Sequence, residues 1–135
     1  MEMTKEVKEI MDNVKFTYRK SDNQTTHMFS SGHMKYTCKI SYNGKTFQTT
    51  YQCNPQYSDM SKIKFDFIYC ILLDKNTYDN SRDINDFASS IGMDYYENEK
   101  EVNRCYNACE KASHKLDEMF SQEELDILDE FFREW

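Results

Sequence analysis

The pattern of apolar and polar positions divides the chain into an alternating N-terminal part and a helical C-terminal part. The densest apolar run, residues 65–73, would be apolar on more than one side of a helix. A helix of this kind lies in the centre of a fold, with neighbours on two sides. We therefore predict a central helix over residues 62–73, around which the other elements pack.

The N-terminal segment changes its period at Val14. A helical spacing of apolar residues predicts an amphipathic helix over residues 4–13, with Thr4 as its N-cap. Those apolar residues are Val7, Ile10, Met11 and Val14. Residues 14–18 then alternate, which predicts a half-buried strand with Val14, Phe16 and Tyr18 on one face. A polar loop over residues 21–32 follows.

Asn43-Gly44 lies between two alternating runs and predicts a β-hairpin over residues 34–53, because a type I′ turn needs positive φ at both central residues. A two-residue loop also sets the register. It places Tyr42 opposite Lys45, Ile40 opposite Phe47, Cys38 opposite Thr49, Tyr36 opposite Tyr51 and Met34 opposite Cys53. One face of the hairpin is then apolar and the other is Lys, Thr, Gln and Ser.

Three further helices are predicted after the central one. Residues 74–82 are rich in turn formers and predict a connection, followed by a short helix over residues 83–91 that ends at Gly92. A continuous apolar stripe predicts a long helix over residues 99–120. Ser121 and Glu124 form a capping box that starts the last helix at Gln122.

The last helix ends in Phe131, Phe132 and Trp135, which either dock on the body or offer an apolar patch to a partner. Docking is the usual fate of such a face. The fold class is therefore α+β: a small three-stranded antiparallel sheet from the N-terminal half, packed against a C-terminal cluster of about four helices. Residues 1–135 form a single domain, with its sheet part in 1–60 and its helical part in 61–135.

Charge is distributed unevenly along the chain. Residues 1–60 carry eight Lys/Arg and six Asp/Glu, and residues 61–135 carry nine and eighteen, so the two parts have net charges of +2 and −9. The acidic part favours a basic partner surface, and it also fits a plain soluble face. The N-terminus lacks the apolar core of a signal peptide and no run is long enough to span a membrane, so we expect a cytoplasmic protein.

Four stretches carry a resemblance to a known family. They are residues 65–73, the phrase Ile84-Asn85-Asp86-Phe87-Ala88-Ser89-Ser90-Ile91-Gly92-Met93-Asp94, residues 104–115 and residues 120–128. Together they resemble a family of small bacteriophage and prophage accessory proteins that carries the phrase F-x-D-F-C-x-x-x-G-Y-D. The chain departs from that phrase at Ala88, where Cys is common, and at Met93, where Tyr is common.

The resemblance implies a non-enzymatic protein that binds and inhibits a host defence nuclease, such as a CRISPR effector, in the bacterial cytoplasm. Its acidic helices would occupy a basic nucleic-acid channel, so direct nucleic-acid binding by them is not expected. The residues proposed to contact the partner are Asp117, Glu118, Glu123, Glu124, Asp126, Asp129 and Glu130. We expect Glu123, Glu124, Asp126 and Asp129 to be exposed.

Two other hypotheses come from the residues themselves. The polar sheet face, with Lys15, Arg19, Lys35 and Lys39, would contact nucleic acid if the chain served phage DNA metabolism. Its aromatics lie on the opposite face, whereas a nucleic-acid surface interleaves them with the bases.

An enzyme would use the thiols or carboxylates instead. Cys105 and Cys109 share a helical face and would need Cys38 or Cys53 to complete a metal site, without a knuckle spacing. The three histidines, His27, His33 and His114, match no local catalytic signature. Five carboxylates surround the central turn and suit turns and caps as well as a cation: Asp74, Asp79, Asp83, Asp86 and Asp94. We therefore expect no catalytic residues, metal or cofactor.

Overall fold

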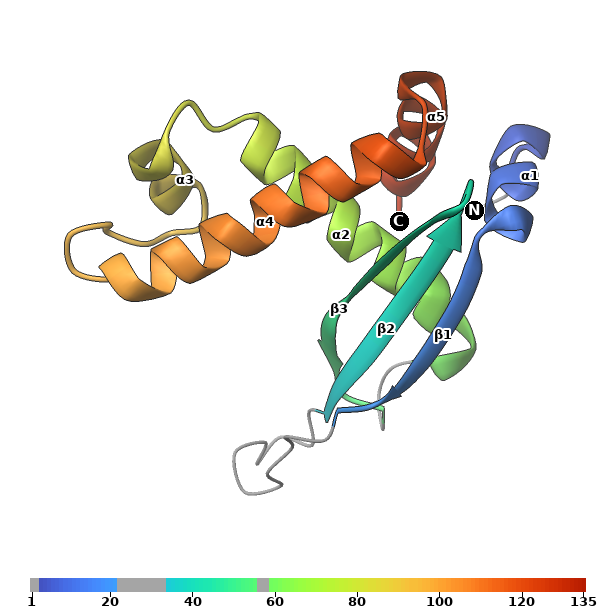
Figure 1. Cartoon of the computed structure of the whole chain (residues 1–135), viewed down its shortest axis with the longest axis horizontal. Coiled ribbons are helices and arrows are strands. Elements are labelled where there is room, and N and C mark those ends of the chain that lie inside the picture. Colours follow the sequence, from blue (N-terminus) through green and yellow to red (C-terminus); the bar gives the residue numbers. More distant parts are fainter. Residues whose placement is uncertain (1–2, 22–33, 56–58) are drawn as a thin grey trace.

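The computed structural model describes residues 3–21, 34–55 and 59–135, and within them it shows the predicted α+β fold. A three-stranded antiparallel sheet of order β1-β2-β3 lies against helices of the C-terminal part (Figure 1). The elements are α1 (Lys5–Asn13), β1 (Lys15–Lys20), β2 (Met34–Tyr42), β3 (Lys45–Cys53), the 3-10 turn η2 (Met60–Lys62), α2 (Ile63–Asp79), α3 (Ile84–Ser90), α4 (Glu99–Met119) and α5 (Gln122–Phe132).

The hairpin of β2 and β3 has the predicted register at every position, from Tyr42 opposite Lys45 to Met34 opposite Cys53. Asn43 and Gly44 have φ of 52° and 76°, as the predicted type I′ turn requires. The predicted apolar face is the buried one. Its buried members are Tyr36, Cys38, Ile40, Phe47 and Cys53.

Strand β1 completes the sheet at one edge and follows α1 directly. Thr4 caps α1 as predicted, since its Oγ1 accepts a hydrogen bond from the Val7 N–H at 3.2 Å. Phe16 is half-buried, but Tyr18 remains 46% exposed because β1 is an edge strand. The Tyr18 ring nevertheless packs edge-on against Tyr36, with centroids 5.8 Å apart.

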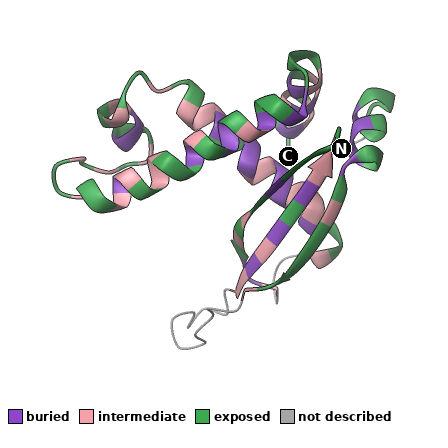
Figure 2. Ribbon diagram, viewed as in Figure 1, coloured by how far each residue is buried: buried purple, intermediate pink, exposed green. Residues whose placement is uncertain are grey.

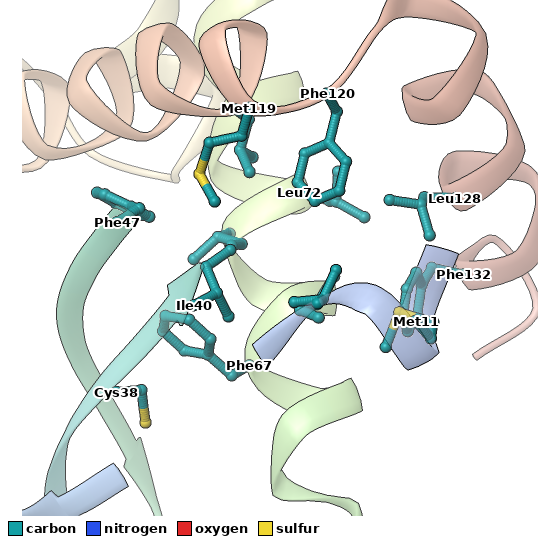
Figure 3. Close-up of a cluster of buried hydrophobic side chains, with 14 of the residues drawn as sticks. Met11, Cys38, Ile40, Phe47, Phe67, Leu72, Met119, Phe120, Leu128 and Phe132 are labelled. Atoms are coloured by element: carbon teal, nitrogen blue, oxygen red, sulfur yellow. The ribbon is translucent and has the colours of Figure 1, made fainter. Parts of the chain in front are cut away.

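Helix α2 is the central element. Phe67 is 1% exposed, and its ring lies 5.9 Å from that of Phe16 and 6.2 Å from that of Tyr51. Figure 3 shows Phe67 beneath Ile40 of the sheet, with Met119 of α4 above them. The prediction of a helix with neighbours on two sides, the hairpin among them, is confirmed.

The prediction that residues 74–82 form a turn-rich connection is wrong for its first part, because α2 continues to Asp79. Polar residues of the last turns find partners on other helices. The Asn76 amide donates to Asp129 on α5 at 3.2 Å, and the Tyr78 hydroxyl donates to Glu110 on α4 at 2.8 Å. These tertiary contacts outweigh the local turn preference of the segment.

A smaller cluster lies beyond the crossing of α2 and α4, where α3 packs on the start of α4. Its buried residues are Phe87, Ala88, Val102 and Cys109. Helix α3 ends at Gly92 as predicted, with φ of 75° and with the Met93 N–H donating to the Ala88 carbonyl at 2.9 Å. In Figure 2 most positions of this region are exposed or half-buried, and few are buried.

Helix α5 begins with the predicted capping box of Ser121 and Glu124. The C-terminal aromatics dock, as expected for an amphipathic helix. The Trp135 indole N–H donates to Asp66 on α2 at 2.9 Å, and its ring lies 5.7 Å from that of Phe65. Across the described ranges, none of the helices is long and apolar enough to cross a membrane.

Candidate partner-binding site

Seven carboxylates at the end of α4 and on α5 are the predicted partner contacts. In the structure some of them contact other elements, and the others are exposed. Asp117, Glu124 and Asp129 make polar contacts with other elements. The expectation that Glu124 and Asp129 are exposed is wrong, because both are half-buried. Glu118, Glu123, Asp126 and Glu130 are exposed.

Asp117 belongs to a polar junction between α2 and α4 in which only Lys75 and Ser113 are buried. Lys75, which is only 7% exposed, donates from Nζ to Asp117 Oδ1 at 2.8 Å, to Asp79 Oδ2 at 2.7 Å and to Ser113 Oγ at 3.5 Å. Burial alone would lower the pKa of Lys75, but the hydrogen bonds from Lys75 to Asp117 and Asp79 outweigh it and raise the pKa. We call Lys75, Asp79, Ser113 and Asp117 the polar junction.

Glu124 joins α5 to the sheet. Its Oε2 accepts a hydrogen bond from the Tyr42 hydroxyl, and its Oε1 accepts from the Ser121 N–H at 2.9 Å. Burial acts to raise the pKa of Glu124, yet the donors Tyr42 and Ser121 outweigh burial and lower it. Burial, followed by the bond to Glu124, raises the pKa of Tyr42 to about 12. Glu124 is therefore a structural carboxylate.

The exposed carboxylates of α5 align along the helix. Glu123, Asp126 and Glu130 are spaced i, i+3 and i+7, which places them on one side, away from the buried Leu125 and Leu128. Asp126 accepts from the Gln122 amide, and the other two form no ion pair within the described ranges. We call Glu123, Asp126 and Glu130 the acidic stripe. Glu118, on α4, forms an ion pair with Lys115, with its Oε2 3.6 Å from the Lys115 Nζ.

A groove of about 420 Å³ runs between α1 and α5, beside the acidic stripe. Ile127 and Phe131 provide most of its apolar surface, Val7 at its floor is buried, and its charged side chains are all glutamates. The lining residues are Thr4, Glu6, Val7, Ile127, Glu130, Phe131 and Glu134. This groove is not evident from the sequence, because it is formed by two helices that lie at opposite ends of the chain.

The polar face of the sheet carries a second hollow, of about 630 Å³. Arg19 and Lys35, two of the four basic residues predicted for this face, line it together with Arg104 from α4, which also pairs with Glu101. Hydroxyl and amide side chains complete the lining: Ser21, Thr37, Thr50 and Gln52. Lys15 and Lys39 do not line it. Arg104 was missed, since nothing in the sequence places α4 beside this face.

The thiols of the enzyme hypothesis lie in separate clusters. Cys38 and Cys53 belong to the sheet core, whereas Cys105 and Cys109 lie with α3. Burial raises the pKa of Cys38 and of Cys109 to about 12, so neither is a reactive thiolate at neutral pH. In the part of the chain that the structure describes, no three His, Cys, Asp or Glu side chains are grouped to hold a metal ion.

The remaining candidate residues of that hypothesis have structural contacts or lie apart from the thiols. Asp83 caps α3 by accepting from the Asp86 N–H at 2.9 Å, and Asp86 accepts from the Arg82 N–H at 3.0 Å. His114 is exposed and faces the edge of the Tyr78 ring. His27 and His33 lie outside the described residues.

Comparison of the chain with protein-family models, with curated proteins and with solved structures finds no match. Function is therefore inferred from three surface features: the acidic stripe, the groove beside it and the hollow of the sheet.

Proposed function

We propose that this chain is a non-enzymatic binding protein that docks its acidic stripe on a basic protein surface. In the setting implied by its resemblance to phage and prophage accessory proteins, the partner is a host defence nuclease, a CRISPR effector being one such enzyme. Occupying the basic channel that holds the nuclease's nucleic acid would then inhibit it. The proposal explains why a small protein presents carboxylates in a row where packing does not need them.

The observation that carries this proposal is that the carboxylates of α5 lie in two different environments. Glu124 and Asp129 turn inward to Tyr42 and Asn76, whereas Glu123, Asp126 and Glu130 project into solvent along one side. Five carboxylates and no Lys or Arg on an eleven-residue helix give a concentrated negative field. Such a field speeds encounter with a basic surface and selects for it.

The contacts and pKa shifts of the thiols and of the central carboxylates support a binding function rather than catalysis. The pKa of Cys109 is raised by burial, and the neighbouring Asp74 carboxylate disfavours the thiolate further. Asp79 and Asp83 are engaged in the polar junction and in a helix cap. These groups therefore have structural partners that account for their positions.

The test is affinity capture of the tagged chain from nuclease-treated bacterial lysate. We expect one stoichiometric nuclease or defence protein, and we expect it to be lost from the variant with Glu123→Lys, Asp126→Lys and Glu130→Lys. The matched control reverses three exposed glutamates elsewhere: Glu9→Lys, Glu97→Lys and Glu99→Lys. The captured enzyme's cleavage of nucleic acid should fall when the wild-type chain is added and persist when the stripe variant is added. Equal capture by both variants would refute a role for the acidic stripe.

A second candidate function is supported by the hollow of the sheet. Arg19, Lys35 and Arg104 converge there from two strands and a helix, among hydroxyl and amide donors that suit phosphate oxygens. We propose as the alternative an accessory factor of phage DNA metabolism that contacts a nucleic-acid backbone at this hollow. Its affinity for labelled DNA or RNA should fall steeply with salt.

Arg104→Ala tests that alternative, with Arg82→Ala as the control because Arg82 is exposed near α3 and does not line the hollow. Binding that weakens only with Arg104→Ala would place nucleic acid in the hollow. Absence of binding at low salt, or equal loss with both variants, would refute this second function.

A further inference from the structure

We infer that the groove between α1 and α5 receives a basic amphipathic helix of the partner protein. The inference rests on the proposed function, because it names the partner element that would lie beside the acidic stripe. It commits to a helix with apolar residues on one face and Lys or Arg on the flanks of that face.

The shape of the groove fits apolar anchor residues. The groove is open to solvent along its length and has a volume of about 420 Å³. Ile127 and Phe131 are half-buried and spaced i, i+4 on α5, and they line the groove together with residues of α1. An amphipathic helix that binds in a groove uses the same spacing for its own anchors.

The charge of the groove selects a basic occupant. Glu6, Glu130 and Glu134 are the charged residues that line it, and within the described ranges none of them forms an ion pair. Lys8, a cation on α1, is held by Asp12 at 2.7 Å. Cationic side chains flanking the apolar anchors would therefore meet three carboxylates that are free to pair.

The walls of the groove indicate a helical occupant rather than an extended one. Both walls are mainly helical, and neither presents the edge of a strand for β-pairing. An occupant in contact with such walls has to satisfy its own backbone hydrogen bonds, and a helix does so.

The occupant is also not a helix of a second copy of this chain. Each of the five described α-helices contains more Asp and Glu than Lys and Arg. A copy of any of them would bring further negative charge to Glu6, Glu130 and Glu134. Like charges at an interface oppose association, so the complementary helix comes from a different, basic protein.

The test uses a designed, fluorescein-labelled peptide of about four helical turns, with Leu at i, i+3, i+4 and i+7 and Lys on the flanks. We expect its anisotropy to rise on titration with the full-length protein. Two matched peptides should not bind: one with Glu in place of each Lys, and one with Ser in place of each Leu. Binding of either control peptide as tight as that of the Lys–Leu peptide would overturn the inference.

Paired variants locate the site. Glu130→Gln with Glu134→Gln should weaken peptide binding about three- to tenfold, as expected for two exposed charge pairs. Glu97→Gln with Glu99→Gln removes the same charge from two exposed glutamates outside both the groove and the acidic stripe, and should change binding less than about twofold. Equal weakening by both pairs would show a general field effect and overturn the groove as the site.

This experiment is separable from the test of the proposed function. If stripe reversal abolishes partner capture but the Lys–Leu peptide does not bind, the groove inference fails and the proposed function stands. If the peptide binds in the groove but lysate yields no partner, the proposed function fails and the inference about the groove stands.

Discussion

The two hydrophobic clusters of the molecule differ in what supports them. The main core joins α1, the sheet, α2, the end of α4 and α5, and contains 21 buried residues in the described ranges. The second cluster, between α3 and the start of α4, contains four. Buried apolar area is the main favourable term in folding, so the main core stabilises the chain as a whole. The second cluster depends on helices that the main core has already placed.

The largest expected effect separates the two clusters directly. Phe67→Ala should lower the free energy of unfolding by about 3–5 kcal/mol, because it opens a cavity in the main core. Phe87→Ala deletes the same group from the second cluster and should loosen α3 while the remainder stays folded. Urea unfolding followed by circular dichroism measures the first effect, and amide hydrogen exchange of α3 measures the second. If Phe87→Ala lowered the free energy of global unfolding as much as Phe67→Ala, the two clusters would form one cooperative unit.

The polar junction connects the two clusters, and its removal has the next largest expected effect. Lys75→Ala should destabilise the protein by about 2 kcal/mol. This is less than a fully buried ion pair would cost, because Asp79 and Asp117 are 39% and 53% exposed and remain hydrated. Lys8→Ala, which breaks an exposed pair with Asp12, should cost less than about 0.5 kcal/mol. Similar urea midpoints for the two variants would contradict this account.

A smaller effect is expected at the end of α3. Gly92→Ala places a side chain at φ of 75°, which should cost about 1 kcal/mol through strain, since a Cβ there meets no neighbour within 4 Å. Faster hydrogen exchange should be confined to α3 and the start of α4. Ser89→Ala, at an exposed helical position, is the control and should leave exchange unchanged. Equally faster exchange across the main core of Gly92→Ala would be inconsistent with two separable regions.

The smallest expected effect is a dependence on pH. The folded state lowers the pKa of Glu124 and of Asp79, because donated hydrogen bonds outweigh their burial. Each therefore contributes stability above the ordinary carboxyl pKa of roughly 4, and this stability is lost as pH falls through the lowered folded pKa. Unfolding free energies measured from pH 7 to pH 3 should decline less in Tyr42→Phe, which removes a donor to Glu124. An unchanged slope would show that the contact is electrostatically neutral.

The hairpin of β2 and β3 could be predicted from the sequence residue by residue, whereas for β1 only a strand near residues 14–18 was predicted. Asn43-Gly44 sets the turn, and the strict alternation on both sides of it permits only one register, because a slip by one residue would bury the polar face. The capping box at Ser121 and the glycine end of α3 were predictable for the same reason: each is a local signal with its own hydrogen bonds.

The end of α2 and the roles of the α5 carboxylates were not predictable in this way. Lys75 and Asn76 stand in a stretch of turn formers, and only the approach of α4 and α5 gives them partners. Glu124 and Asp129 resemble Glu123 and Glu130 in sequence, and they differ in which elements of the fold they face. The spacing of residues in a single sequence shows which side chains share a face of a helix, but it does not show which other element packs against that face.

The capping box of α5 has a consequence for how this protein can change over generations. The start of α5 is fixed by Ser121 and Glu124 and its inner face by Leu125 and Leu128, so the acidic stripe carries no folding signal apart from the first-turn position of Glu123. Substitutions along the stripe are therefore expected to alter recognition with little effect on stability. A lineage could retarget the protein by varying this one side of a helix while inheriting the fold unchanged.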